Sequence, residues 1–184
     1  MNRRKVWAVA FARQAEADLN TYHFLDQEAI IPRCQPLHFL QMACEKLCKA
    51  QLCHTGANPE DLAKSHAYVR EHLPKLFRRF YTEQKRAVPR ADSMFMKQIG
   101  LVAREIDLLS PSVRDGERRL DNSEYPWGVR DGSGDERVFI PATHEFATLD
   151  LLNQPVGRKM LKLLRISINA LVGEQTESKK MGSS

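Results

Sequence analysis

HFLQMACEKLCKAQL, residues 38–52, is the stretch that decides the fold, because its apolar side chains recur every three or four positions. Leu40, Cys44 and Leu47 fall on one face of a helix, and this periodicity predicts an amphipathic helix from about residue 36 to 53. Glu45 precedes Lys49 by four residues, the spacing at which opposite charges pair along a helix. The stretch therefore predicts a helix with one face in a core.

The same periodicity predicts further helices on both sides of this stretch. Their approximate ranges are 6–25, 59–73, 75–81, 93–109 and 155–172. Asn58 and Pro59 are typical of a helix start, so they mark the beginning of the helix over 59–73. Pro74 is expected to end or kink this helix. Amphipathic helices with short connections predict an all-α fold, an antiparallel up-and-down bundle of four to six helices within residues 1–173.

Residues 112–153 differ from the rest because Gly, Asp, Ser and Pro are frequent there. We expect an irregular insertion before the last helix, with one small β-hairpin formed by Gly128 to Arg130 and Val138 to Ile140. The polar residues 174–184 predict a disordered tail.

The composition fits a cytoplasmic globular protein. The chain has 184 residues, of which 42% are hydrophobic and 28% charged, and a net charge of +5. No apolar run approaches the roughly 18 residues of a membrane span, so no membrane association is expected. The charge is uneven, since residues 62–104 are basic and residues 105–136 are acidic. The net charge alone permits a nucleic-acid partner without requiring one.

The four cysteines lie close together in the sequence, between residues 34 and 53. Cys44 and Cys48 are one helical turn apart on the apolar face of the predicted helix, whereas structural zinc sites usually use tight Cys-x2-Cys turns. A zinc or redox site is the alternative to core packing, and the spacing favours core packing. We therefore predict no metal and no cofactor.

The quoted stretch resembles the second helix of the HEPN family (higher eukaryotes and prokaryotes nucleotide-binding domain). The matching residues are Gln41, Ala43, Glu45-Lys46, Lys49-Ala50 and Leu52. Three further segments match in the same order, namely ARQAEADL at 12–19, Ser65-His66 and Glu124-Tyr125-Pro126. The resemblance implies a bundle that is usually dimeric. It marks Glu45, Lys46, Lys49, His66 and Tyr125 as motif positions.

Members of this family differ in function. Some are metal-independent ribonucleases, often toxins of prokaryotic toxin–antitoxin or phage-defence systems. Others lack catalysis and bind nucleotide or RNA, or act beside a nucleotidyltransferase. The ribonucleases carry an Arg and, a few residues later, a His near the last helix. Arg137 and His144 fit this spacing, and so do Arg33 and His38 at the other end of the fold.

The residues between Arg137 and His144 do not favour catalysis. Val138 stands where the ribonucleases often have a polar residue, and Pro141 prevents a helical turn. A spacing this permissive also arises by chance. We therefore favour a non-catalytic HEPN-like module, a homodimer that binds nucleotide or RNA or pairs with a nucleotidyltransferase. A ribonuclease that uses Arg137 and His144 is the first alternative, and a structural adaptor without a nucleic-acid role is the second.

Basic residues supply the candidate nucleic-acid contacts. Arg158, Lys162 and Arg165 recur on one face of the last predicted helix, and Arg78-Arg79 lie on an earlier one. Such stripes neutralise phosphates, although a solvated helical face is the commoner explanation. Tyr125 and Trp127 are candidates either for stacking on a base or for anchoring the loop.

Overall fold

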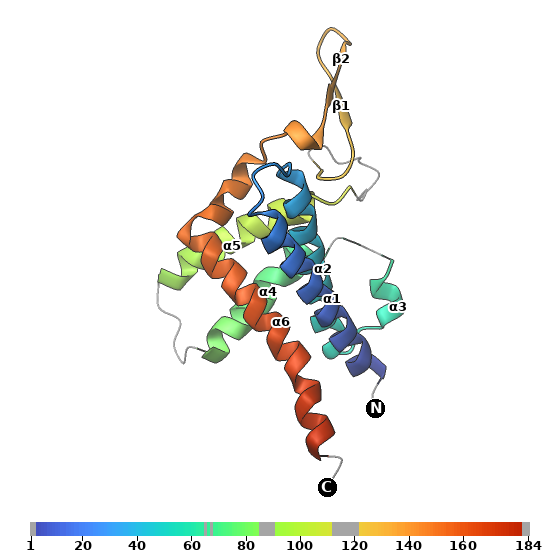
Figure 1. The fold of residues 1–184 in the computed structure, drawn as a ribbon, viewed down its shortest axis with the longest axis vertical. Coiled ribbons are helices and arrows are strands. Elements are labelled where there is room, and N and C mark those ends of the chain that lie inside the picture. Colours follow the sequence, from blue (N-terminus) through green and yellow to red (C-terminus); the bar gives the residue numbers. More distant parts are fainter. Residues whose placement is uncertain (1–2, 65, 67, 85–90, 112–121, 182–184) are drawn as a thin grey trace.

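A computed structural model of the chain describes residues 3–64, 66, 68–84, 91–111 and 122–181. Five long helices form a bundle, which confirms the predicted all-α class (Figure 1). They are α1 (Arg3–Leu25), α2 (Cys34–His54), α4 (Val69–Gln84), α5 (Ala91–Leu108) and α6 (Pro155–Met181). A single-turn helix, α3 (Pro59–Leu62), lies beside the bundle. No helix in the described ranges is long and apolar enough to cross a membrane.

Helices α1 and α2 lie side by side in opposite directions along most of their length (Figure 1). The face of α1 that meets α2 carries small buried residues, among them Ala12 and Ala15. Small side chains let two helices approach closely, so that larger residues of α2 such as Leu40 and Leu47 fill the space around the contact. This pair is the most extensive contact in the fold and forms one wall of the core.

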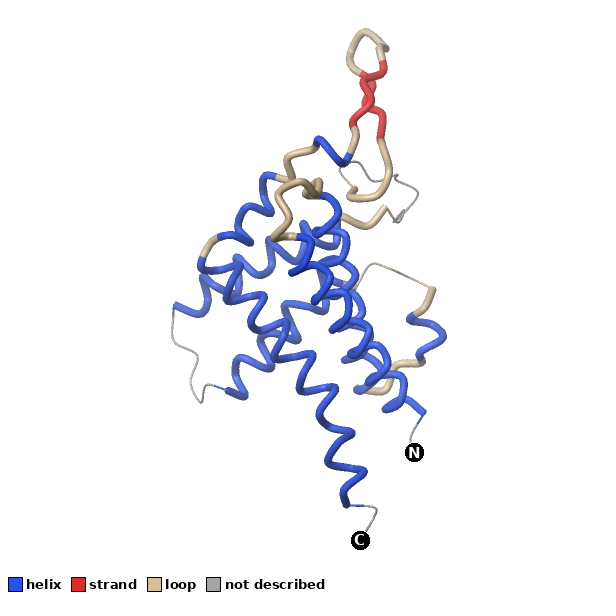
Figure 2. The backbone as a smooth tube through the Cα atoms, viewed as in Figure 1, coloured by secondary structure: helices blue, strands red, loops and turns tan. Residues whose placement is uncertain are grey.

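Helices α4, α5 and α6 complete the bundle (Figure 2). Their largest buried side chains, among them Phe77, Ile99 and Leu164, join those of α1 and α2 in one hydrophobic cluster. Such burial is worth about 1.5–3 kcal/mol for each large apolar side chain. The cluster therefore supplies the main driving force for assembling all five long helices.

The helix expected over residues 59–73 is divided in the structure, which corrects that prediction. Asn58 caps α3 as expected, since its side-chain oxygen accepts a hydrogen bond from the Glu60 backbone nitrogen at 3.4 Å. The helix nevertheless ends at Leu62, and α4 begins at Val69 and includes Pro74. Helix α4 begins at Val69 because of a residue far away in the sequence. The Asp107 carboxylate accepts a hydrogen bond from the Val69 backbone amide at 3.0 Å.

The predicted hairpin is confirmed and projects from one end of the bundle (Figure 2). Strands β1 (Trp127–Arg130) and β2 (Glu136–Phe139) are antiparallel, and Trp127 lies opposite Phe139. The two rings stack with centroids 5.8 Å apart at the base of the hairpin. At its tip Gly134 has φ of +91°, a backbone conformation that glycine adopts without strain.

The part of the insertion that follows the hairpin is more regular than the sequence predicts. Two 3-10 helices, η1 (Pro141–Thr143) and η2 (Ala147–Asn153), follow the hairpin. Leu149 and Leu152 of η2 are buried in the main cluster, so the end of the insertion belongs to the core. Helix α6 continues to Met181 instead of ending near residue 172. Of the tail expected to be disordered at 174–184, residues 174–181 are helical, and 182–184 lie outside the described residues.

We predict that Gly157→Ala destabilises the protein by about 1–3 kcal/mol, the usual cost of overpacking. A Cβ at Gly157 would collide with the backbone of Leu151 and Leu152, where α6 begins against η2. Urea unfolding followed by circular dichroism measures the effect. Gly100→Ala in α5 is the matched control, because its added Cβ would meet no described atom within 4 Å apart from its chain neighbours and the nearby backbone of its own helix. It should be neutral or stabilise by up to about 1 kcal/mol, the helix-propensity difference. Equal destabilisation of both variants would contradict the packing explanation.

Candidate nucleic-acid interface

The three predicted cations of the last helix lie on its outer face. Arg158 and Lys162 are exposed, and Arg165 is half-buried where α6 meets α1. Arg158 donates from Nη1 to the Asn153 carbonyl at 2.7 Å, and Arg165 donates from Nη1 to Asn20 Oδ1 at 2.7 Å. Both partners are neutral. We call Arg158, Lys162 and Arg165 the basic stripe.

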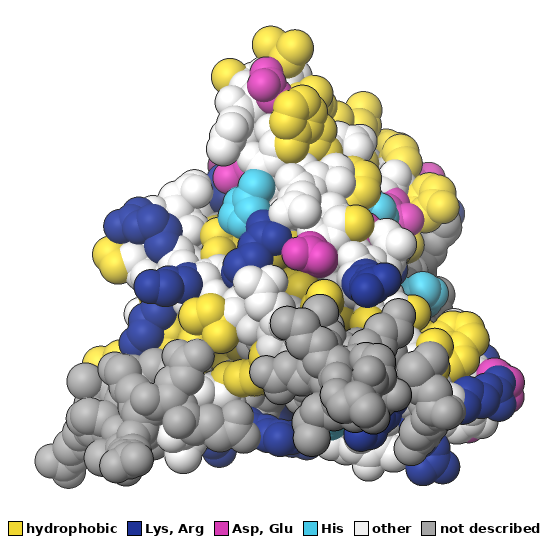
Figure 3. Space-filling model, turned by 60° about the horizontal axis from the view of Figure 1, so that its bottom comes forward, with side chains coloured by type: hydrophobic (Ala, Val, Ile, Leu, Met, Phe, Trp, Pro, Cys, Tyr) yellow, Lys and Arg dark blue, Asp and Glu magenta, His cyan; other side chains and the backbone are white. Residues whose placement is uncertain are grey.

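The basic stripe has no carboxylate partner among the described residues, and other exposed cations such as Arg13, Arg78 and Lys97 share this property. Lys64 pairs with Asp61 at 2.9 Å and Lys75 pairs with Glu71 at 2.8 Å. Figure 3 shows Lys and Arg side chains in several separate groups rather than in one patch. What marks the stripe is therefore that three cations without a carboxylate partner recur along one helix, α6.

His23 of α1 adds a group that the sequence did not single out. Burial lowers the pKa of its imidazole, and the nearby Arg165 guanidinium lowers that pKa further. The neutral imidazole can therefore both donate and accept hydrogen bonds near neutral pH. Asn20 and His23 are three residues apart on α1 and meet a residue more than 140 positions away. No local pattern in the sequence could have shown that encounter.

Arg78 and Arg79, also expected to bind nucleic acid, are exposed on α4. Helix α4 contacts α6, but Arg165 of the basic stripe bonds to Asn20 of α1, and Arg158 bonds to Asn153 at the end of η2. The structure therefore places the five candidate cations on two helices, α4 and α6. Arg165 is the one that we find beside both Asn20 and His23 of α1.

Three of the motif positions converge on one buried carboxylate, that of Glu45. Glu45 is almost fully buried, and its carboxylate contacts Lys49 Nζ at 2.6 Å and His66 Nδ1 at 3.1 Å. Gln41 Nε2 donates to the same carboxylate at 3.1 Å. Glu45 and Lys49 form the predicted i,i+4 pair, and the pair is buried rather than solvated. We call Gln41, Glu45, Lys49 and His66 the polar cluster.

The other motif positions serve separate contacts. Lys46 Nζ pairs with Asp18 Oδ2 of α1 at 2.6 Å, which ties α2 to α1. His66 lies outside any helix, with its side chain 52% exposed, so the helix predicted over 59–73 was wrong at this position. Tyr125 is 56% exposed, whereas Trp127 is 6% exposed. Trp127 therefore anchors the hairpin, and Tyr125 alone of these two rings is free to stack on a ligand.

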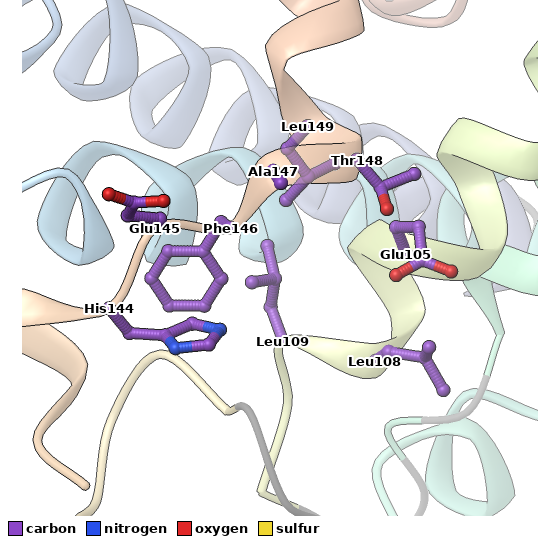
Figure 4. A pocket seen from close by; sticks show the side chains of 9 residues that line it. All are labelled: Glu105, Leu108, Leu109, His144, Glu145, Phe146, Ala147, Thr148 and Leu149. Carbon is purple, nitrogen blue, oxygen red and sulfur yellow. The ribbon is translucent and has the colours of Figure 1, made fainter.

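The two catalytic candidates do not meet within one chain. Arg137 lies over the Phe139 ring at 5.3 Å, and Phe139 stacks on Trp127. His144 packs its ring edge-on against Trp127 at 5.2 Å and against Phe146 at 4.7 Å. Two aromatic rings thus separate Arg137 from His144 along this path of contacts. His144 lines a cleft beside α5 instead (Figure 4).

The cysteines pack in the core, which confirms the interpretation of their spacing. All four are free and buried. Burial raises the pKa of the Cys44 and Cys48 thiols, so they stay protonated and poorly nucleophilic. Within the described ranges, no group of three or more His, Cys, Asp or Glu side chains could hold a metal ion.

Comparison of the chain with protein-family models, with curated proteins and with solved structures finds no match in any of the three.

We predict that Lys49→Met costs about 3–5 kcal/mol, because it leaves the Glu45 carboxylate buried without its cation. The double variant Glu45→Leu/Lys49→Met should lose less than the sum of its single variants, since it removes both charges. Chemical unfolding of the four proteins measures the coupling. Lys75→Met removes an exposed cation of the same i,i+4 spacing and should change stability by less than about 0.5 kcal/mol. The coupling would be contradicted if the loss of unfolding free energy in the double variant equalled the sum of the losses in Glu45→Leu and Lys49→Met.

We predict that Arg165→Gln raises the pKa of His23 but leaves it below the ordinary value of 6.5, because burial is the larger cause of the lowered pKa. The imidazole titration followed by NMR tests this. The folded chain holds this proton less tightly than the unfolded chain, so stability falls as pH drops below about 6.5, and the fall should be smaller in Arg165→Gln. Arg158→Gln removes the same charge elsewhere on the stripe and should leave the His23 titration nearly unchanged. An equal shift in both variants would contradict the direct effect of Arg165.

Proposed function

We propose that this chain is a non-catalytic, HEPN-like helical module that binds RNA or a nucleotide through the face shared by α1 and α6. The observation that carries the proposal is the uncompensated charge of Arg158, Lys162 and Arg165. Phosphates bind cations whose charge is not already neutralised by a carboxylate, and the release of their counterions drives the association.

Arg165 is the centre of the proposed contact. Its hydrogen bond to Asn20 uses one nitrogen of the guanidinium, and the remaining donors of the planar fork stay available for phosphate oxygens. His23 stands beside it as a neutral hydrogen-bonding group suited to a ribose hydroxyl or a base edge. These contacts favour the phosphate backbone over a particular base, so binding is expected to depend weakly on sequence.

The resemblance supports three further proposals of partners and setting. We propose that the module forms a homodimer and works in a prokaryotic toxin–antitoxin or defence-type system. Pairing with a nucleotidyltransferase is the alternative to binding RNA or a nucleotide. A homodimer would place two basic stripes on one assembly, and two linked sites bind a long RNA more tightly than one.

Catalysis is the second candidate function. A ribonuclease would need Arg137 and His144 from two copies to meet, because an acid or base must lie within hydrogen-bond reach of its proton. The binding function is favoured because it requires no rearrangement of the contacts around Trp127. The structural adaptor remains the outcome if no RNA binds.

We predict that the triple variant Arg158→Gln/Lys162→Gln/Arg165→Gln binds single-stranded RNA at least tenfold more weakly at low salt. Each lost phosphate contact should reduce the slope of log K against log salt by about 0.7. Fluorescence anisotropy of a labelled RNA of mixed sequence, between about 50 and 200 mM salt, measures both quantities.

The matched control for this experiment removes three other surface charges, in Arg3→Gln/Lys64→Gln/Lys75→Gln. Each of these cations already pairs with a carboxylate, so affinity and slope should change little. Equal weakening in both triple variants would show a general charge effect and contradict the proposed interface. No binding by the unaltered protein at low salt would favour the adaptor. RNA cleavage that persists in EDTA and disappears in Arg137→Gln would favour the ribonuclease.

A further inference from the structure

A cleft of about 360 Å³ lies between the C-terminal part of α5 and the segment that leads into η2 (Figure 4). Its buried lining is apolar and consists of Leu109, Phe146 and Leu149. In Figure 4 the Phe146 ring lies between the His144 imidazole and Leu109. The cleft thus combines an aromatic ring with aliphatic walls, a lining typical of sites that hold a mostly apolar body.

Polar groups surround this apolar lining, and none of them is a cation of the chain. Glu105 of α5 and Glu145 contribute carboxylates, and Thr148 and His144 contribute a hydroxyl and an imidazole. Figure 4 shows the Glu105 carboxylate beside Thr148, on the opposite side of Leu109 from His144. Within the described part of the chain, neither carboxylate has an ion pair or a hydrogen bond to another side chain. The lining includes no Lys or Arg.

The chemistry of this lining selects the charge of a ligand. Carboxylates beside a cleft repel phosphate, so the cleft does not extend the proposed RNA interface. A cation with an apolar stem is complementary, since its head can reach a carboxylate while its stem covers Leu109 and Leu149. A planar guanidinium fits better than an ammonium, because it can donate to a carboxylate through two nitrogens at once while its weakly hydrated flat face covers the apolar lining.

We propose that this cleft binds an arginine side chain presented by a partner polypeptide. Arginine is enriched among the residues that anchor protein interfaces, where the side chain enters a pocket and its head forms charge-assisted hydrogen bonds. The site is independent of the basic stripe on α6 and takes a ligand of opposite charge. The module therefore has one surface for phosphates and another for a basic protein segment.

The test uses a blocked peptide, acetyl-Gly-Arg-Gly-amide, titrated into the full-length protein labelled with ¹⁵N. The backbone amides of residues 105, 109 and 144–149 should shift in a saturable way. The same peptide with citrulline in place of arginine keeps the size and planar shape of the head group, but it lacks the charge and has a carbonyl oxygen in place of one donating nitrogen. It should bind about tenfold more weakly, the usual value of a charge-assisted hydrogen bond.

Two variants locate the contact and a third controls for net charge. Glu105→Gln should weaken the arginine peptide about tenfold, and Glu145→Gln should weaken it several-fold because Glu145 is more exposed. Glu28→Gln removes an equal charge from an exposed loop after α1 and should leave the affinity unchanged. Equal binding of the citrulline peptide, shifts that fall elsewhere, or equal affinity of Glu105→Gln would each overturn the proposal. A failure of RNA binding would leave this result unaffected.

Discussion

The buried carboxylate of Glu45 is the constraint on which the arrangement of the bundle depends. An ionised group removed from water is costly unless several donors replace the water, and Lys49, Gln41 and His66 do so here. Two of these donors lie on α2 itself, whereas His66 precedes α4. The contact therefore holds the segment before α4 against the middle of α2, and α2 in turn packs against α1, α4, α5 and α6.

The side chains of the polar cluster contact one another, so they are not the groups that we propose for binding. The motif positions on α2 stabilise the bundle, so the groups able to meet a partner lie elsewhere, on α6 with α1 and around the cleft beside α5. These two places carry opposite charge, since Arg165 meets the neutral Asn20 while Glu105 faces an apolar lining without a cation. The net charge of +5 conceals this division, because it averages over surfaces of opposite charge.

The predictable parts of the fold are those fixed by neighbours in the sequence. Periodicity predicts the long helices, and turn residues predict the hairpin, because both depend on residues a few positions apart. The division between α3 and α4 was missed because its cause, the bond from the Val69 amide to Asp107, joins residues 38 positions apart. The site follows the same rule. The basic stripe is visible in the sequence, but its meeting with Asn20 and His23 depends on how two distant helices pack.

The spacing of Arg137 and His144 shows why a pattern of residues carries a function only together with its backbone. On a helix this spacing would bring the two side chains within about two turns on related faces. Here Arg137 lies on a strand, where residues two apart share a face, so it stacks on Phe139. Pro141 then begins a 3-10 turn that redirects the chain, and His144 packs against the edge of Trp127. The intervening backbone thus turns a candidate catalytic pair into the two ends of an aromatic stack that holds the hairpin to the bundle.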